Sequence, residues 1–224
     1  MRLYARGLVS ALSLAVCLAG CENGQRSLPA IRQSAEHAMY IKDYEKAVSE
    51  YGEIIQRRPE MYRDRLGQAQ AYLAMGKPAE AREQLEIAYT IRPNDADVID
   101  LLARAMLESG DLTSLAGELR ANAEAKNRVW DWLLFGRYMF FAGDHDEAEK
   151  ALLTAARLDR GQSVHPQLSL AELYQRAGDD AKALDRYRMA LYLAPDDEKI
   201  NNAIRAMGEV PGPTFALRPA EQGG

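Results

Sequence analysis

The most regular feature of the sequence is the spacing of its small and apolar positions, which repeats about every 34 residues. Each repeat contains a small residue, a second small or apolar residue twelve positions later, and a larger one four positions after that. The three sets are Ala35, Ala69, Ala103, Gly136 and Ala171; Ala47, Ala81, Leu115, Ala148 and Ala183; and Tyr51, Leu85, Leu119, Leu152 and Tyr187. A fixed period of this length predicts stacked copies of one supersecondary unit.

Within each unit the pattern predicts two amphipathic helices of roughly 14 residues joined by a turn. Apolar residues four positions apart share one helix face, and the small residues let the paired helices approach closely. Glycines mark four of the turns: Gly76, Gly110, Gly143 and Gly178. Prolines, which block continuation of a helix, end three of the second helices: Pro59, Pro93 and Pro195. Because one hairpin cannot bury its apolar face alone, neighbouring hairpins must stack.

We expect five units, near residues 28–61, 62–95, 96–128, 129–163 and 164–197. The first lacks the turn glycine. The third departs most, because Leu115 replaces the packing alanine, Asn122 replaces a small apolar residue and no proline closes it, which leaves its helix packing angle open. Acidic residues and amphipathic spacing predict a solvating cap helix over 198–207. The Pro- and Gly-rich residues 208–224 predict a flexible tail.

These units resemble the tetratricopeptide repeat. Trp132, Phe135, Gly136 and Met139 stand at the spacing where that family has Trp, Leu, Gly and Tyr, and the last unit matches it with Leu170, Ala171, Tyr174, Gly178, Ala183, Tyr187, Ala190 and Pro195. The resemblance covers about 170 residues. It implies an all-α, right-handed superhelical solenoid of about five helical hairpins with a C-terminal capping helix, whose first helices line a concave groove.

The first twenty residues carry the pattern of a secretory signal peptide. Arg2 and Arg6 precede an apolar run over 8–18, which is too short for a permanent membrane span of about 20 residues. The exit, Leu-Ala-Gly before Cys21, resembles the lipobox of bacterial lipoproteins, which implies acylation of Cys21 as the membrane anchor and a tether over 21–27. In lipoproteins of this kind, an aspartate directly after the lipidated cysteine favours retention in the inner membrane. Position 22 holds glutamate instead, so the resemblance implies an outer-membrane protein that faces the periplasm. The alternative, a buried N-terminal helix, does not explain the leading arginines.

Composition excludes several classes of function. A formal net charge of -5 argues against nucleic-acid binding, which needs a basic surface to neutralise phosphates. Two cysteines and three histidines are too few for a disulfide framework or a multi-histidine metal centre. The sequence holds no phosphate-binding loop, nucleophile elbow or zinc motif. We therefore expect no enzyme activity, no cofactor and no metal, and we attribute the acids around His145 to a repeat turn.

An aromatic run over 130–141 is the one unusual segment, holding both tryptophans and three of the four phenylalanines. Trp132, Phe135 and Met139 follow the packing pattern and are expected in the core. A helix that is apolar all round is either buried or covered by a partner. The remaining residues are predicted to face the concave groove and bind a partner, together with Arg104 of the preceding unit: Trp130, Leu133, Arg137, Phe140 and Phe141. Alternatively, these side chains fill a gap left by the loosely packed third unit.

The groove-facing positions also indicate which partners to expect. Some members of the family clamp a partner's C-terminal carboxylate with Lys and Asn on their first helices. The corresponding positions here hold no asparagine. They hold Arg32, Glu36, Arg63, Gln70, Asp100 and Arg104. Length, anchor and repeat number resemble the tetratricopeptide lipoproteins of Tad (Flp) pilus assembly and the PilF/PilW-type pilotins, and also NlpI and BamD. The resemblance implies a lipid-anchored scaffold that binds an envelope protein, such as a secretin or another pilus component. The alternatives are an adaptor or regulatory subunit of cell-wall or outer-membrane biogenesis enzymes, and a small-molecule binder.

Overall fold

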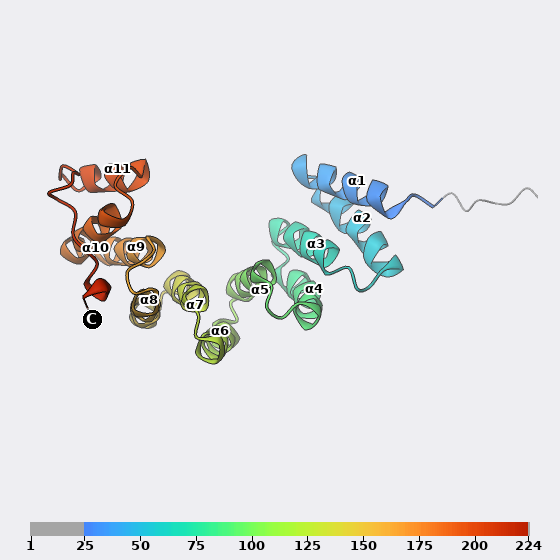
Figure 1. Cartoon of the computed structure of the whole chain (residues 1–224). Helices are drawn as coiled ribbons and strands as arrows, with labels where there is room; N and C mark the ends of the chain where they lie inside the picture. The colour runs from blue at the N-terminus through green and yellow to red at the C-terminus, as the bar shows by residue number, and fades with distance from the viewer. Residues whose placement is uncertain (1–24, 224) are drawn as a thin grey trace, which may run out of the picture.

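The computed structural model describes residues 25–223, which form eleven α-helices, one short 3-10 helix and no strand (Figure 1). Their bounds are α1 Leu28–Tyr40, α2 Tyr44–Arg57, α3 Tyr62–Ala74, α4 Pro78–Ile91, α5 Ala96–Ser109, α6 Leu112–Lys126, α7 Val129–Phe141, α8 His145–Asp159, α9 His165–Ala177, α10 Asp180–Leu193, α11 Glu198–Ala206 and η1 Ala220–Gln222. The predicted signal peptide and Cys21 lie outside the described residues. None of the described helices is long and apolar enough to cross a bilayer.

Local sequence explains where these helices begin and turn. Aspartates accept hydrogen bonds from first-turn backbone N–H groups, which otherwise lack partners: Asp43, Asp95, Asp111, Asp144, Asp179 and Asp197. The glycine turns adopt positive φ, as at Gly110 (77°). In the first hairpin, which lacks the glycine, Lys42 takes the left-handed conformation instead, with φ of 63°.

The helices form five consecutive hairpins followed by α11, and the hairpins succeed one another along a curved stack (Figure 1). Each helix packs against the next in sequence. The first helices of neighbouring hairpins also contact each other, α1 with α3, α3 with α5, α5 with α7 and α7 with α9, whereas within the described residues the second helices do not. The first helices therefore line the concave side. The predicted all-α solenoid with a C-terminal helix is confirmed.

Close helix crossings depend on the small residues. A Cβ on Gly67 of α3 would lie 2.5 Å from the Tyr51 ring of α2, and a Cβ on Gly136 of α7 would lie 2.7 Å from Leu152 of α8. Three small residues in the first helices are completely buried: Ala35, Ala69 and Ala171. The repeat of small residues thus marks the places where helices meet.

The third hairpin departs from the others, as its sequence suggested. α5 and α6 contact each other over a shorter stretch than the helices of the other four hairpins. Leu115, in place of the usual alanine, is fully buried between them, and a larger side chain at a crossing moves the helices apart. A gap of about 30 Å³ lies between α4, α5 and α6.

Residues 209–223, which were expected to belong to a flexible tail, return over the last hairpin and make specific contacts with it. The backbone N–H of Leu217 donates to the Arg188 carbonyl at 3.1 Å, and Arg186 pairs with Glu221 at 2.7 Å. The Gln222 amide donates to the Gly161 carbonyl at 2.6 Å. Composition indicated flexibility because the segment is rich in proline and glycine, but a few specific side chains hold it in place.

Candidate functional site

Two hollows lie side by side on the concave face, where α7 meets α9. The first, named the Trp130 hollow, has a volume of about 210 Å³ and is lined by Trp130, Leu133, Leu134, Arg137, His165 and Ser169. The second, named the Phe141 hollow, has a volume of about 160 Å³ and is lined by Arg137, Phe140, Phe141, Leu152, Ser169, Glu172 and Arg176. Arg137 and Ser169 border both, so the hollows form one continuous surface.

The structure brings five of the predicted groove residues together on this surface. Trp130 and Phe141 are 36% and 53% exposed, unusually high for large apolar side chains, while Leu133 and Phe140 are half-buried. Phe135 and Met139 are buried as expected. Trp132 is only partly buried, because its indole N–H reaches out to the Asn127 side chain at 3.1 Å.

Arg137 is tied to the neighbouring hairpin. Its guanidinium forms an ion pair with Asp100 of α5 and lies over the Tyr138 ring, 5.3 Å from the centroid. The Tyr138 hydroxyl donates to the Asp100 backbone carbonyl at 2.8 Å, and burial and the Asp100 carboxylate raise the pKa of this hydroxyl. Arg137 and Asp100 therefore present a neutral ion pair at the surface instead of an unpaired positive charge.

Arg176 of α9 is the cation at the far end of the Phe141 hollow. Its guanidinium lies 5.1 Å from the centroid of the Phe140 ring, and the His145 ring also packs near Phe140, with 5.6 Å between the two ring centroids. No carboxylate within the described residues forms an ion pair with Arg176. A cation over an aromatic ring beside open apolar surface suits an acidic or amphipathic partner segment.

Arg104, the sixth predicted groove residue, is not part of either hollow. It lies on α5 and pairs with Glu108 at 2.7 Å, one turn along the same helix. The α9 residues of the hollows were missed by sequence reasoning. The repeat register could have indicated them. Glu172 directly follows Ala171, just as Arg137 directly follows Gly136, so both residues take the same groove-facing position in their units.

A further hollow, of about 390 Å³, lies nearer the N-terminus of the concave face, between α1 and α3. Its charged groups largely satisfy one another. Arg32 donates two hydrogen bonds of 2.7 Å to the buried Asp64, and Arg92 lies over the Tyr62 ring at 5.4 Å. Because its arginine and aspartate already pair with each other, this hollow is a weaker candidate for partner binding.

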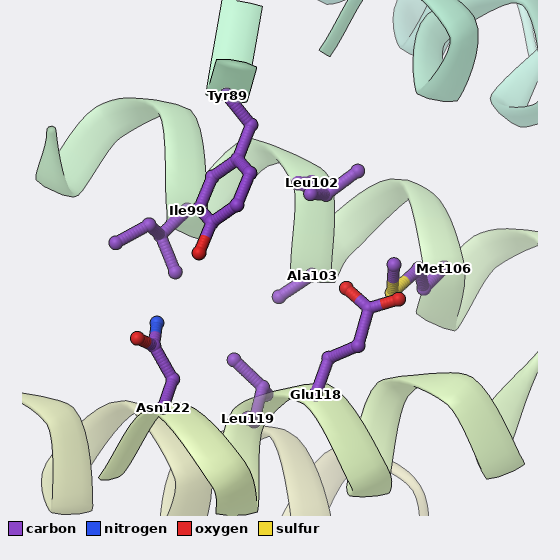
Figure 2. Close-up of a pocket in the computed structure, with 8 residues that line it drawn as sticks. All are labelled: Tyr89, Ile99, Leu102, Ala103, Met106, Glu118, Leu119 and Asn122. Carbon is purple, nitrogen blue, oxygen red and sulfur yellow. The ribbon is translucent and has the colours of Figure 1, made fainter. Parts of the chain in front are cut away.

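The gap in the third hairpin allows the alternative interpretation of the aromatic run to be examined. Figure 2 shows Tyr89 of α4 pointing into this gap from one side and Glu118, Leu119 and Asn122 of α6 from the other. Its remaining lining comes from α5, and none of the α7 aromatic residues reaches it.

The described residues contain no group of three His, Cys, Asp or Glu side chains placed to hold a metal ion. His145 stacks on Phe140, and His165 borders the Trp130 hollow without a neighbouring carboxylate in its lining. The chemistry available on the concave face is thus apolar contact, hydrogen bonding and charge pairing.

Comparison with known families agrees with this architecture. Two family models, each described as a tetratricopeptide repeat, match residues 42–105 and 133–198. The first match runs from α2 through α3 and α4 into α5, and the second runs from within α7 to the start of α11. No curated protein sequence matches the chain.

Several solved structures share the fold. TTC0263, a thermophilic TPR protein in Thermus thermophilus, is 20% identical with a TM-score of 0.55, over 80% of this chain and 98% of that one. MamA from Desulfovibrio magneticus RS-1 is 14% identical with a TM-score of 0.54, over 76% and 97%. A tetratricopeptide repeat protein from Parabacteroides merdae ATCC 43184 is 10% identical with a TM-score of 0.58, over 84% and 73%. Identities this low show likeness of fold alone.

Proposed function

Because this chain belongs to the tetratricopeptide repeat family, we propose that it is a non-enzymatic scaffold whose concave face at α7 and α9 binds a segment of a bacterial-envelope protein. The observation that carries this proposal is the continuous surface formed by the Trp130 and Phe141 hollows. It leaves two large aromatic side chains exposed next to arginines, and aromatic and arginine residues contribute most to binding energy at protein interfaces.

The site's dimensions suit a short peptide segment. Trp130 and Phe141 are eleven residues apart on one helix, which corresponds to about 16 Å along its axis. Apolar anchors at that separation fit an amphipathic helix of about three turns or a shorter extended stretch. The free charge of Arg176 favours an acidic residue beside the anchor that enters the Phe141 hollow.

The location of this scaffold is part of the proposal. The Leu-Ala-Gly-Cys21 motif supports lipid attachment at Cys21 and a place in the outer membrane, facing the periplasm. The partner would then be a pilus or secretion component, with a secretin of a Tad or type IV pilus first. Changing Cys21→Ser tests the anchor: intact-mass analysis of the membrane fraction should show acyl groups on the wild type and none on the variant. A wild-type protein without acyl groups would contradict it.

Partner binding is tested with a double change, Trp130→Ala and Phe141→Ala, measured as affinity for the purified secretin subunit of the same organism. Loss of two exposed anchors should weaken binding by roughly thirtyfold or more. The matched control is Ile87→Ala with Leu112→Ala, which removes similarly exposed apolar side chains from the second helices, 41% and 42% exposed.

The outcomes separate binding from folding. The control pair should leave the affinity unchanged, and both double variants should melt within a few degrees of the wild type, because all four side chains are substantially exposed. A lowered melting temperature with unchanged secretin binding would show that Trp130 and Phe141 serve the stack instead. If the wild type does not bind the secretin, that choice of partner is wrong.

A further inference from the structure

The second and fifth hairpins both anchor the start of their first helix to the preceding turn, but they use different segments of the chain. In the second hairpin, the anchor is Arg65 of α3, which is buried. Its guanidinium donates two hydrogen bonds, of 3.1 and 3.2 Å, to the Pro59 carbonyl of the preceding turn. It also donates to the Gln84 side chain of α4 at 2.7 Å. One side chain therefore links the first turn of α3 to the turn before it and to the second helix.

In the fifth hairpin, the residues at the same three repeat positions are Gln167, Gly161 and Arg186, counted from the small residues of their helices. Gln167 is fully buried and accepts a hydrogen bond of 2.8 Å from Arg186 of α10. The hydrogen bond to the Gly161 carbonyl, however, comes from Gln222 of the C-terminal tail, at 2.6 Å. The tail therefore makes the link to the preceding turn that α3 makes with its own arginine.

Two further contacts complete the docking of the tail. Glu221 pairs with Arg186 at 2.7 Å and accepts a hydrogen bond of 3.1 Å from the Gln167 amide, so one carboxylate joins α10 to the first turn of α9. Pro219 is buried against the turn between α8 and α9, where a Cβ on Gly161 would lie 2.7 Å from its side chain. The end of the tail is therefore packed against this turn, α9 and α10 at once (Figure 1).

The start of α9 lacks the side-chain cap that its neighbours have. Asp144 and Asp179 cap α8 and α10, whereas Val164, which precedes α9, has no side-chain atom that can accept a hydrogen bond. The first N–H groups of a helix have no partner within the helix, and an uncapped first turn is less stable than a capped one. Through Gln167, the tail supplies part of the anchoring that a capping residue gives to α8 and α10.

The same part of α9 forms one wall of the concave surface. His165 lines the Trp130 hollow and Ser169 borders both hollows, and because they are four residues apart they share one helix face. Gln167 lies midway between them in sequence and its side chain bonds to α10 and the tail, on the other side of α9. The opposite wall of the Trp130 hollow belongs to α7. The width of this hollow therefore depends on where the first turn of α9 lies relative to α7.

We propose that Glu221 and Gln222 are positioning residues for partner binding, because the docked tail holds the first turn of α9 at the distance from α7 that the Trp130 hollow requires. Neither residue lines the hollows, so both act through Gln167 and the turn at Gly161. This role rests on the proposed function, since it concerns the same surface. A wall that is already ordered favours binding, because the partner does not have to order it.

The first measurement needs no partner. Trp132→Phe leaves Trp130 as the only tryptophan, so the fluorescence of this full-length protein reports on the Trp130 hollow. In this background, Glu221→Ala should increase the quenching of Trp130 by acrylamide and shift its emission to longer wavelength, because the α9 wall of the hollow loosens. The matched control is Gly67→Ala at the crossing of α2 and α3, which should also lower stability through overpacking. It should leave the quenching and the emission unchanged.

Reversing the charges of the ion pair tests the contact itself. Arg186→Glu combined with Glu221→Arg keeps one carboxylate and one guanidinium around Gln167. The Gln167 amide carries both donors and an acceptor, so it can serve the reversed pair after turning over. The double variant should therefore return the quenching of Trp130 toward that of the parent protein, whereas each single change should increase it.

Affinity for the purified secretin subunit, measured well below the melting temperature of every variant, is the second measurement. Glu221→Ala should weaken binding by about tenfold, because the partner must then order α9 as it binds. Gly67→Ala, which is remote from the hollows, should change the affinity by less than about twofold.

The two measurements separate this role from the proposed function. A wild type that does not bind the secretin refutes that partner, and the fluorescence of Trp130 then decides the role of the tail. Quenching that is the same with and without Glu221→Ala, or that Gly67→Ala increases equally, would overturn the proposal. A folded Glu221→Ala protein that binds the secretin as tightly as the wild type would overturn it as well.

Discussion

Arg137 of α7 and Asp100 of α5, 37 residues apart in sequence, form an ion pair that joins the first helices of the third and fourth hairpins. Both side chains are about half-exposed, so the pair sits at the rim of the partner-binding surface. Arg137 was expected to face the groove and bind a partner, and within the structure Asp100 already neutralises its charge. The same carboxylate accepts a hydrogen bond of 3.0 Å from the Tyr138 hydroxyl. Asp100 of the third hairpin therefore binds two side chains of the fourth, Arg137 and Tyr138.

A charge-swap series tests this pairing. Arg137→Asp should lower the free energy of unfolding by about 0.5–1 kcal/mol, because it places two carboxylates together at a half-exposed site. Adding Asp100→Arg should restore most of that loss. Urea midpoints of the two single variants and the double variant measure the coupling. Additive effects of the two changes would show that the pair contributes nothing to the stack.

Two glycine-to-alanine changes should have opposite effects. Gly67→Ala places a methyl group 2.5 Å from the Tyr51 ring at the crossing of α2 and α3, and should destabilise the protein by about 1–3 kcal/mol through overpacking. Gly117 lies inside α6 with no atom within 4 Å of the added Cβ. Gly117→Ala should therefore stabilise by about 0.5–1 kcal/mol, since alanine favours helix. Chemical denaturation of both variants checks the signs, and a loss at both positions would contradict the helix register.

The C-terminal tail should contribute measurably to stability. Glu221→Ala leaves Arg186 without its carboxylate in a nearly buried position, where the two side chains are 14% and 10% exposed. We expect a loss of about 1–3 kcal/mol, because a nearly buried guanidinium loses its carboxylate partner and retains the Gln167 side-chain oxygen as an acceptor. Arg218→Ala removes an exposed arginine that hydrogen-bonds to Gln222, and it should cost under about 0.5 kcal/mol. Equal urea midpoints for the two variants would indicate a tail that does not dock.

The buried tyrosines predict a loss of stability at alkaline pH. Burial, together with Asp100 for Tyr138 and Glu149 for Tyr174, raises the pKa of both hydroxyls. The folded protein then retains protons that the unfolded chain releases above about pH 10, so the free energy of unfolding falls as pH rises beyond that value.

Tyr138→Phe should reduce the slope of this alkaline decline, because phenylalanine has no proton to lose. Tyr40→Phe, which changes an 85% exposed side chain, is the matched control and should leave the slope unaltered. Urea denaturation at pH 8, 9.5 and 10.5 measures both. Identical slopes for Tyr138→Phe and the wild type would show that this hydroxyl titrates normally.

Sequence alone predicted the helical hairpins, their number and the approach of α7 and α8 at Gly136, because these depend on local periodicity and on side-chain size at fixed spacing. It also placed Trp130, Arg137 and Phe141 on one side of a helix, since 100° per residue is a local property. It predicted that the third hairpin would depart from the others, but not by how much, because a helix crossing angle depends on all the side chains at the contact.

Only the tertiary structure decided which groups meet across repeats. Asp100 neutralises Arg137, Ser169 and Arg176 complete the hollows, and Glu221 docks on Arg186 and Gln167, 35 and 54 residues away in sequence. These relationships arise where separate segments are stacked, and no local pattern encodes the distance between residues that the chain brings together only by folding.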